Sequence, residues 1–324
     1  MEEIRWGIIG CGDVTEVKSG PAFNKINQSK LVAVMRRDGA KAADYAKRHQ
    51  VPKWFDDATQ LINDPEVNAI YIATPPLQHE AYTIEALKAG KPVYVEKPMT
   101  LDAEAAQRMT DAANTLNVKL CVAHYRRAQP MFLKVKELLA ANMIGDIRLV
   151  RLKMLQSPNP SLIAKTANNW RINPAISGGG LFHDLAPHQL DLMTYYFGAV
   201  KNAIGIATRQ QEDTEVDDLV SGNIIFENGV VFSGDWCFSV APQDEADLCS
   251  IFGSTGHINF PMFGNKITVT TNQSTEEYSF EPLAHVQQPM IEKVVDYFLG
   301  KGPNPCSGED ALITMKLMDD FTKG

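Results

Sequence analysis

Two stretches of the sequence carry side chains that could move protons or stabilise developing charge. From Lys91 to Pro98, an apolar run ends abruptly on an acid, a base and a proline. From Gly178 to Asp191, an apolar segment holds Asp184 and His188 four residues apart, hence on one face of a helix. A carboxylate one turn from an imidazole orients the ring and tunes its pKa. The two stretches predict acid–base chemistry, although a histidine on an apolar helix could equally be a core residue.

The residues before Lys97 indicate how it would be positioned. Pro92 to Val95 has the β-branched and aromatic bias of a short buried strand, and it follows a helical pattern closed by Gly90. Ligands of open parallel sheets bind outside the carboxyl ends of the strands, so Glu96 and Lys97 would project into a ligand crevice. The Lys97-Pro98 bond is a candidate for the cis isomer, with trans as the default expectation. The alternative is a solvated charge pair at a strand end.

The second stretch begins with three consecutive glycines, Gly178 to Gly180, which would let the backbone pass close to a ligand. Pro187 requires the following helix to begin near His183 or Asp184, or to kink. Upstream, Trp170-Arg171 offers an aromatic plane and a cation that could close over a cofactor. Packing in the core is the alternative for that pair.

A phosphate-binding turn stands near the start of the chain. The strand Ile4–Ile9 leads into Gly10-Cys11-Gly12-Asp13-Val14-Thr15, a Gly-x-Gly-x-x-Gly pattern with Thr15 in the third glycine's place. Gly10 would make the tight turn, and Gly12 would let the backbone approach a pyrophosphate at a helix N-terminus. The turn predicts a bound dinucleotide, and its threonine predicts looser packing of the helix on the strand.

The end of the second strand predicts which dinucleotide binds. The strand Leu31–Met35 should meet the adenosine ribose, where an NAD enzyme normally presents Asp or Glu. This chain presents Arg36 and Arg37, while Asp38 would cap the helix Gly39–His49. Guanidinium groups match phosphate oxygens, so the pair predicts a clamp for a 2′-phosphate and favours NADP(H) over NAD(H). A solvated arginine pair on a loop is the alternative.

Strands and helices alternate as far as Ala123. Further strands are expected at Trp54-Phe55, Asn68–Ala73, Pro92–Val95 and Lys119–Ala123, with helices between them. After the strand Asn68–Ala73, two prolines would pin a loop from which Thr74 and His79 could face the cofactor. This alternation is what a doubly wound parallel sheet requires.

The pattern changes in the second half of the chain. A helix (Met131–Ala141) precedes a strand (Ile147–Leu155), and later strands are joined by turns such as Glu227-Asn228-Gly229. Those strands are expected at Ala203–Thr208, Leu219–Phe226, Val230–Phe238, Asp247–Phe252 and Lys266–Thr271. The prediction is an α/β protein with a Rossmann domain, residues 1–123, and an α+β substrate-binding and oligomerisation domain, residues 124–324. The second domain would have an open, mostly antiparallel sheet, and its uncovered face predicts a homodimer or homotetramer.

The composition bears on several classes of function. A length of 324 residues favours two domains, and the net charge of −8 argues against a nucleic-acid or anionic-membrane partner. No apolar run approaches the length of a membrane span, and Met1-Glu2-Glu3 is unlike a signal peptide. The five cysteines show no metal-type spacing, so no metal site is expected. We expect reduced thiols in a cytoplasmic protein.

Together these residues resemble the glucose–fructose oxidoreductase/inositol dehydrogenase family (Gfo/Idh/MocA) over essentially the whole chain. The resemblance rests on Gly10-x-Gly12, Ala73-Thr74-Pro75, Glu96-Lys97-Pro98, and Gly178-Gly179-Gly180 followed by Asp184 and His188. It implies that Lys97, Asp184 and His188 meet at the nicotinamide. Trp170-Arg171 resembles a cofactor-contacting pair of the anhydrofructose-reductase branch, and a dihydrodiol-dehydrogenase-like branch is the other candidate. Thr15 and Arg36 depart from the family pattern.

The resemblance and the residues together predict an NADP(H)-dependent oxidoreductase that moves hydride between nicotinamide and a carbonyl or alcohol carbon of a sugar-like or polyol substrate. His188 would act as general acid/base, Lys97 would donate a hydrogen bond to the reacting oxygen, and Asp184 would orient His188 or bind a substrate hydroxyl. The other expected substrate-binding residues are Tyr125 and Arg127. The expected cofactor-binding residues are Gly10, Cys11, Gly12, Asp13, Val14, Arg36, Arg37, Ala73, Thr74, Pro75, His79, Glu96, Lys97, Trp170 and Arg171.

Two alternatives share this fold. One is a non-enzymatic dinucleotide-binding sensor, such as the galactose-pathway repressor of yeasts. The other is a glycosidase that uses a tightly held NAD for transient oxidation. Lys97, Asp184 and His188 argue against the sensor, because a sensor does not need a proton relay.

Overall fold

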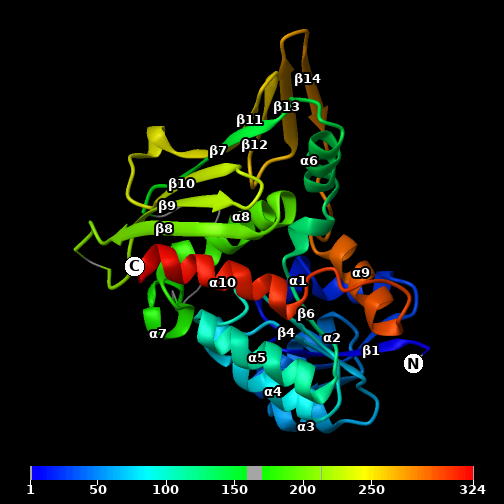
Figure 1. The fold of residues 1–324 in the computed structure, drawn as a ribbon. Coiled ribbons are helices and arrows are strands. Elements are labelled where there is room, and N and C mark those ends of the chain that lie inside the picture. The colour runs from blue at the N-terminus through cyan, green and yellow to red at the C-terminus, as the bar shows by residue number, and fades with distance from the viewer. Residues whose placement is uncertain (1, 159–169, 213, 324) are drawn as a thin grey trace. The chain divides into compact units, whose positions relative to one another are not determined.

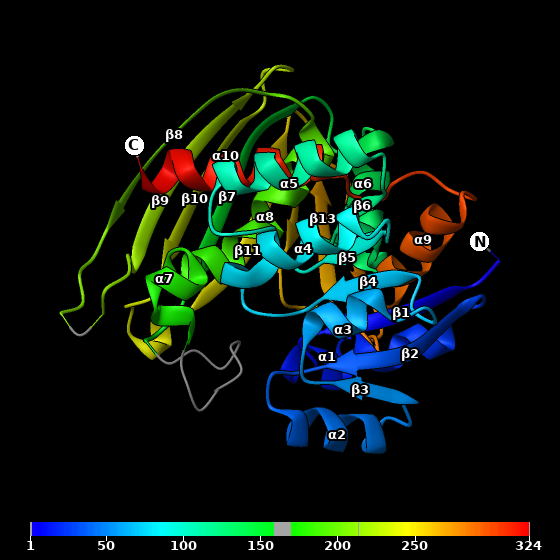
Figure 2. The same cartoon turned by 90° about the horizontal axis from the view of Figure 1, so that it is seen from below.

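The computed structural model describes residues 2–158, 170–212 and 214–323. The chain forms two compact units, whose elements are drawn in Figures 1 and 2. Unit 1 comprises Met1–Gln129 and Leu283–Leu312, and unit 2 comprises Pro130–Pro282 and Ile313–Gly324. The sequence suggested one boundary after residue 123, whereas residues 283–312 return to the N-terminal unit. The roles assigned to the two domains stay predictions.

Unit 1 contains a six-stranded sheet in the order β3-β2-β1-β4-β5-β6, in which every pair of neighbours is parallel. Its strands are β1 (Ile4–Ile9), β2 (Ser29–Met35), β3 (Lys53–Phe55), β4 (Ala69–Ile72), β5 (Val93–Val95) and β6 (Leu120–Val122). This is the strand order of a doubly wound dinucleotide-binding sheet. The predicted Rossmann fold is confirmed.

Helices cover both faces of this sheet. The helices α3 (Ala58–Asn63), α4 (His79–Lys88) and α5 (Ala103–Leu116) run together along one face (Figures 1 and 2). Near β1 lie the five-residue helix α1 (Asp13–Val17), the 3-10 turn η1 (Gly20–Lys25) and α9 (Gln288–Leu299). The Trp6 ring of β1 lies 5.5 Å from the Phe298 ring of α9. Helix α2 (Gly39–Arg48) follows β2, and Asp38 caps it as predicted, because its carboxylate accepts from Lys41 N.

Unit 2 contains an eight-stranded sheet in the order β14-β13-β12-β11-β7-β10-β9-β8. Its strands are β7 (Ile147–Leu155), β8 (Val200–Thr208), β9 (Leu219–Phe226), β10 (Val231–Cys237), β11 (Ala246–Gly253), β12 (Gly256–Phe260), β13 (Lys266–Thr271) and β14 (Thr275–Ser279). All neighbours are antiparallel except β7 and β10, which run parallel. The predicted mostly antiparallel sheet is confirmed.

One face of this sheet is covered by α6 (Pro130–Ala140), α8 (Gly180–Phe197) and the end of α10 (Gly308–Thr322). Trp236 Nε1 of β10 donates to Gln189 Oε1 of α8 over 3.0 Å. Phe321 of α10 lies with its Cα and Cβ atoms over Gly205 and with its ring over Gly222, and the two glycines are paired across β8 and β9. Any side chain at Gly222 would overlap that ring, so the two glycines make room for the helix.

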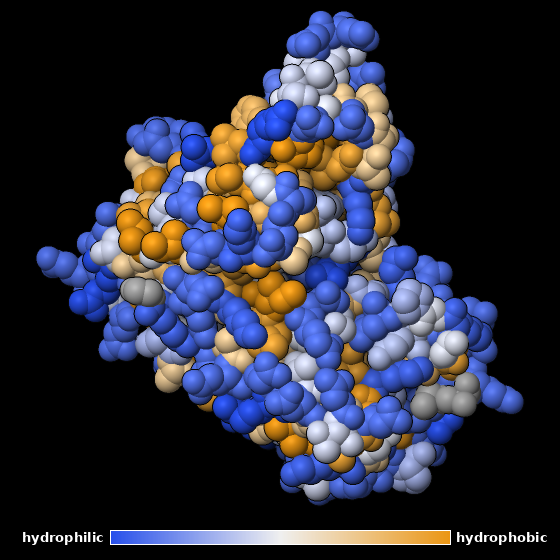
Figure 3. All heavy atoms as spheres, in the orientation of Figure 1, coloured by the Kyte–Doolittle hydropathy of each residue, from blue (hydrophilic) through white to orange (hydrophobic). Residues whose placement is uncertain are grey.

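The opposite face of the sheet leaves apolar side chains exposed. Ile204 and Ile206 of β8 are 64% and 70% exposed, and the neighbouring strands add Ile225, Val231, Leu248 and Phe252. In Figure 3, hydrophobic residues break the polar surface over these strands. Within residues 2–158, 170–212 and 214–323, the sheet therefore has one open face, as the sequence suggested. Among the described residues, no helix is both long and apolar enough to cross a bilayer.

Candidate active site

The glycine turn and the Thr74 loop lie side by side at the carboxyl ends of β1 and β4. Gly10 has a φ of 96°, and a side chain on it would overlap the backbone of Thr74. The bond from Ala73 N to Ile9 O, 2.8 Å long, fixes the loop beside the turn. This is the point where the strand order reverses, the usual ligand site of an open parallel sheet.

The residues of this turn fit a dinucleotide. Gly12 precedes α1, and a Cβ atom on it would meet nothing closer than the Gly10 carbonyl oxygen at 3.9 Å, so the space beside it is open. The first N–H groups of a helix have no partner within the helix and suit an anion. Thr74 Oγ1 is buried without a hydrogen-bond partner among the described residues. Thr15 is fully buried, and its hydroxyl donates to Gly12 O over 2.8 Å.

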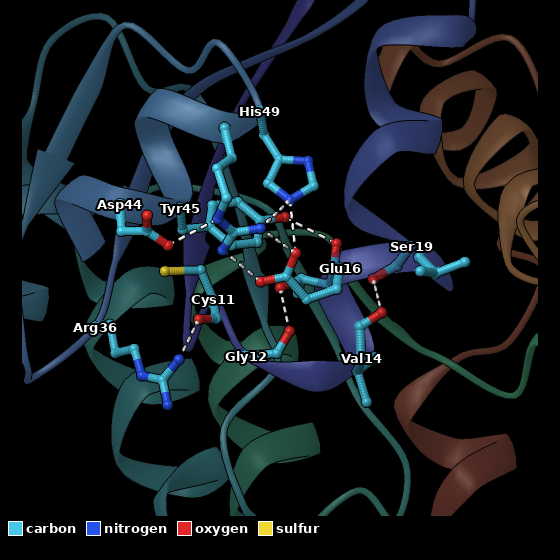
Figure 4. Close-up of polar contacts among 12 residues, drawn as sticks. Cys11, Gly12, Val14, Glu16, Ser19, Arg36, Asp44, Tyr45 and His49 are labelled. Atoms are coloured by element: carbon cyan, nitrogen blue, oxygen red, sulfur yellow. Dashed lines mark hydrogen bonds and ion pairs between the residues drawn. The ribbon is translucent and has the colours of Figure 1, made fainter. Parts of the chain in front are cut away.

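The end of β2 brings a guanidinium group to the glycine turn. Arg36 Nη1 donates to Cys11 O over 3.3 Å, as Figure 4 shows, while Arg37 is exposed. The carboxylate of Asp38 accepts from the backbone of α2, so it serves as the helix cap. Burial raises the pKa of the Cys11 thiol to about 11, so this cysteine stays protonated and contributes through its backbone.

A second cation near the turn is already engaged. Arg48 Nη1 and Nη2 donate to the two carboxylate oxygens of Glu16 over 2.7 and 2.8 Å, and Arg48 Nε donates to Asp44. His49 Nε2 lies 2.8 Å from Glu16, near the centre of Figure 4. The hydrogen bond from Arg48 lowers the pKa of Glu16 to about 2. This network joins α1 to α2 and leaves Arg36 as the candidate for a phosphate.

The loop after β5 holds Lys97 between buried groups. The Lys97-Pro98 bond is cis, and Lys97 N donates to Glu96 Oε2 over 3.2 Å. The ring of His79 is 1% exposed, with Nε2 at 2.7 Å from Thr74 O and Nδ1 at 3.0 Å from Pro98 O. His79 thus lies between the Thr74 loop and the Lys97 loop, and its neutral ring, with one N–H, donates to one of the two carbonyls.

Sequence reasoning missed the partners of Glu96. Its carboxylate is 6% exposed and accepts from Tyr71 Oη and Gln287 Nε2. Gln287 is the N-cap residue of α9, 191 residues further along the chain. No local pattern links these positions, so no sequence signal predicts this contact. It becomes visible only in the structure, where the polar side chain of Gln287 is buried.

In unit 2, Asp184 of α8 pairs with Arg171. Arg171 Nε donates to Asp184 Oδ2 over 2.9 Å, and its guanidinium carbon lies 4.6 Å from the centre of the Trp170 ring. The two charged side chains are 12% and 18% exposed. The structure thus brings Asp184 to the Trp170-Arg171 pair, which the sequence singled out apart from it.

The candidate acid/base His188 is 3% exposed, and its ring centre lies 6.3 Å from that of Phe263. Backbone N–H groups of Met262 and Phe263 donate to Asp247 over 2.8 and 2.7 Å, which fixes the loop carrying this aromatic ring. Phe263 was not anticipated, because a single aromatic residue in a loop carries no spacing signal.

Of the two starts that the sequence left open for α8, the one near His183 or Asp184 is wrong. The helix starts at Gly180 and contains Pro187. Ser177 Oγ accepts from Gly180 N over 3.1 Å, and Gly180 has a φ of 75°. The glycines therefore form the start of the helix, and a proline within it costs one backbone hydrogen bond.

Tyr125 and Arg127 lie on the 3-10 turn η3 (Tyr125–Ala128) of unit 1, and both are buried. Arg127 Nη1 lies 3.3 Å from Asp310 Oδ2 at the start of α10. Lys97 also belongs to unit 1, whereas Asp184 and His188 belong to unit 2. No group of three or more His, Cys, Asp or Glu side chains able to hold a metal ion occurs in the described part of the chain.

Comparisons with known proteins identify the family. Residues 4–124 match the oxidoreductase family with an NAD-binding Rossmann fold, and residues 132–259 match the GFO/IDH/MocA C-terminal domain. The chain is 49% identical over 318 residues to oxidoreductase P35 of Formosa agariphila, which covers 98% of both proteins. It is 30% identical over 254 residues to the trans-1,2-dihydrobenzene-1,2-diol dehydrogenase of Bos taurus, covering 78% of this chain and 72% of that one.

Solved structures share the fold. An oxidoreductase from Thermotoga maritima superposes with a TM-score of 0.87 at 23% identity, covering 98% of this chain and 95% of that one. A levoglucosan dehydrogenase in complex with NADH and levoglucosan gives a TM-score of 0.85 at 21% identity, covering 98% and 96%. The chain belongs to the Gfo/Idh/MocA family of oxidoreductases, and it is an NAD(P)-dependent dehydrogenase or reductase.

Proposed function

We propose that the protein is an NADP(H)-dependent oxidoreductase that transfers hydride between the nicotinamide and a carbonyl or alcohol carbon of a sugar-like or polyol substrate. The observation that carries the coenzyme choice is the hydrogen bond from Arg36 Nη1 to Cys11 O. It holds a cation beside the glycine turn, where an NAD enzyme presents a carboxylate.

The electrostatics at the end of β2 favour the phosphorylated coenzyme. Charge-assisted hydrogen bonds from a guanidinium group contribute about 1.5–3 kcal/mol, or about one to two powers of ten in affinity. The nearest carboxylate along the chain, Asp38, caps α2 through Lys41 N. Its other oxygen pairs with Lys41 Nζ over 3.3 Å, so both oxygens are engaged, which reduces the repulsion of a phosphate.

The proposed chemistry assigns one task to each side chain. When bound, the coenzyme supplies or accepts hydride at the nicotinamide. Lys97 donates a hydrogen bond to the reacting oxygen and stabilises its developing charge. His188 transfers the hydroxyl proton, and its burial limits exchange of that proton with water. Asp184 of α8 orients His188 or binds a substrate hydroxyl, and its bond from Arg171 Nε keeps the carboxylate in place.

The proposed substrate is a cyclic compound with neighbouring hydroxyl groups. The names of two similar proteins, a trans-1,2-dihydrobenzene-1,2-diol dehydrogenase and a levoglucosan dehydrogenase, support this class. Within unit 2, the charged pair Arg171–Asp184 lies with the Trp170 ring, and Phe263 packs near His188. Charged groups can hydrogen-bond to hydroxyl groups, whereas aromatic rings can pack against the apolar faces of a ring-shaped substrate.

The test is a panel of ketoses, inosose-type ketones, anhydro-sugars and aromatic dihydrodiols, each assayed with NADP(H) and NAD(H). We expect a change in the absorbance of the reduced coenzyme with at least one substrate, and more turnover with NADP(H). Binding of coenzyme without turnover of any substrate would favour a sensor. Cleavage of a glycoside without net coenzyme change would favour a glycosidase.

A further inference from the structure

A buried carboxylate lies directly behind Lys97. Glu96 Oε1 accepts from Tyr71 Oη and from Gln287 Nε2, each over 2.5 Å. Its other oxygen accepts from Lys97 N over 3.2 Å. A buried carboxylate is costly unless hydrogen-bonded, and these bonds from two buried side chains and one backbone amide satisfy it.

The amide of Gln287 has a fixed orientation. Tyr94 Oη donates to Gln287 Oε1 over 3.2 Å, which leaves Nε2 to face Glu96. Gln287 is 1% exposed, and its backbone N donates to Lys18 O over 3.2 Å. Backbone and side chain are both held, so this residue is a rigid support at the start of α9.

The two phenols remain donors at all working pH values. Burial, and then the charge of Glu96, raise the pKa of Tyr71 well above its ordinary value. Burial is also the largest cause of the raised pKa of Tyr94. The titratable groups near this network include Tyr71, Tyr94, Lys97, the thiols of Cys121 and Cys306 beyond Tyr94, and His285, two residues before Gln287.

We propose that Gln287 is a positioning residue for Lys97. Its amide holds the Glu96 carboxylate in place, and that carboxylate holds the backbone N–H of Lys97. The inference rests on the proposed function, in which Lys97 meets the reacting oxygen. Residues 283–312, the later part of unit 1, would thus contribute to catalysis through Gln287. Gln287 itself would contact neither substrate nor coenzyme.

Gln287→Glu tests this directly, because it keeps the shape and replaces the donor by a second carboxyl group. Two carboxyl groups on one buried site share a proton, and one of them has a raised pKa, which for buried glutamic acids reaches about 8–9. We expect kcat near the wild-type value at acidic pH and a fall of about 10–10²-fold as the shared proton is lost. Gln287→Leu should lower kcat at every pH.

Three comparisons isolate the effect. Gln288→Glu makes the same charge change one residue along α9 and should leave the pH profile unchanged. The Kd of the coenzyme should stay at the wild-type value in all these variants. Tyr94→Phe removes only the hydroxyl that orients the Gln287 amide, so it should lower kcat less than Gln287→Leu. It is the deciding variant if the changes at Gln287 prevent folding.

A second readout needs no substrate. Acetic anhydride labels lysine amines, and peptide mass spectrometry gives the rate at Lys97 relative to the exposed Lys88. In Gln287→Glu we expect this ratio to fall as pH rises, because a new negative charge near Lys97 favours its protonated form. If the wild-type protein turned over no substrate, the proposed function would be wrong. The labelling ratio at Lys97 would still test the proposed role of Gln287. A wild-type kcat profile and labelling ratio in folded Gln287→Glu, or a wild-type kcat in folded Tyr94→Phe, would overturn it.

Discussion

The two units hold their candidate residues by different means. In unit 1, the glycine turn, the Thr74 loop and the Lys97 loop follow β1, β4 and β5, and backbone bonds such as Glu96 N to Ile72 O place them. In unit 2, the candidates stand on α8 and on the 3-10 turn η4 (Trp170–Ile172). They are joined by side-chain pairs such as Arg171 with Asp184.

The difference explains what each unit can tolerate. In a parallel sheet the topology determines where a ligand binds, since the carboxyl ends of neighbouring strands meet at one edge. An antiparallel sheet with one covered face has no such edge, so the candidate site of unit 2 depends on contacts between particular side chains. The effect of a substitution in either unit should therefore be measured separately on turnover and on coenzyme binding.

The largest expected effect is a loss of turnover, which we compare between one residue of each unit. Lys97→Ala and His188→Ala should each lower kcat by roughly 10²–10⁴-fold, as loss of a charge-stabilising donor or of a general acid/base does. The Kd of the coenzyme should change little in both. The measurement is steady-state kinetics with coenzyme titration, and Lys88→Ala and His257→Asn are the controls. Near-normal turnover in His188→Ala would move the proton transfer to another group.

The second prediction compares buried histidines. Burial lowers the pKa of His183 in unit 2 from 6.5 to about 4, and burial also lowers that of His79 in unit 1. Between about pH 6.5 and 4, the unfolded chain binds protons that the folded chain does not. Stability should therefore fall as pH falls through this window, by about 3 kcal/mol for His183 alone.

Denaturant unfolding at several pH values measures this slope. His183→Gln should flatten it, and the exposed-face variant His257→Gln should not. A wild-type stability that is constant from neutral pH down to pH 4 would show that His183 titrates normally in the folded protein.

The smallest expected effect concerns the open face of unit 2. Exposed Ile204 and Ile206 should be buried in a homodimer or homotetramer, so wild-type protein should scatter light as at least twice the 35.8 kDa chain. Ile206→Asp should shift it toward the monomer while changing the stability of unit 2 itself by about 0.5 kcal/mol or less. Thr268→Asp on β13 is the control. A wild-type mass near one chain at micromolar concentration would contradict the assembly.

The sequence predicted most of the strands and helices of unit 1, because the local apolar and capping patterns there match the elements that the sheet requires. The strand Ile4–Ile9 and the helix cap Asp38 were both correctly placed. In unit 2, β14 was missed because Thr275 to Ser279 holds only one large apolar residue, Tyr278. Helices α9 and α10 were not assigned, although α10 supplies the Phe321 ring over Gly222.

The candidate site was predictable where a sequence motif or the strand order determines it. Gly10 and Thr74 could be brought together by the strand-order rule, and the structure places them in contact. The pairing of Arg171 with Asp184, 13 residues apart, and the support of Glu96 by Gln287, 191 residues apart, depend on tertiary packing. No spacing rule encodes such contacts.

The most direct test of the account is the coenzyme preference of the wild type and of Arg36→Asp. We predict that wild-type kcat/KM is higher with NADPH than with NADH. Arg36→Asp should lower kcat/KM for NADPH by about one to two powers of ten and affect NADH less, since it replaces a phosphate-binding cation by a repelling carboxylate. Arg148→Asp, at an exposed position of β7, should leave the ratio unchanged. A wild-type preference for NADH, or an unchanged ratio in Arg36→Asp, would contradict the account.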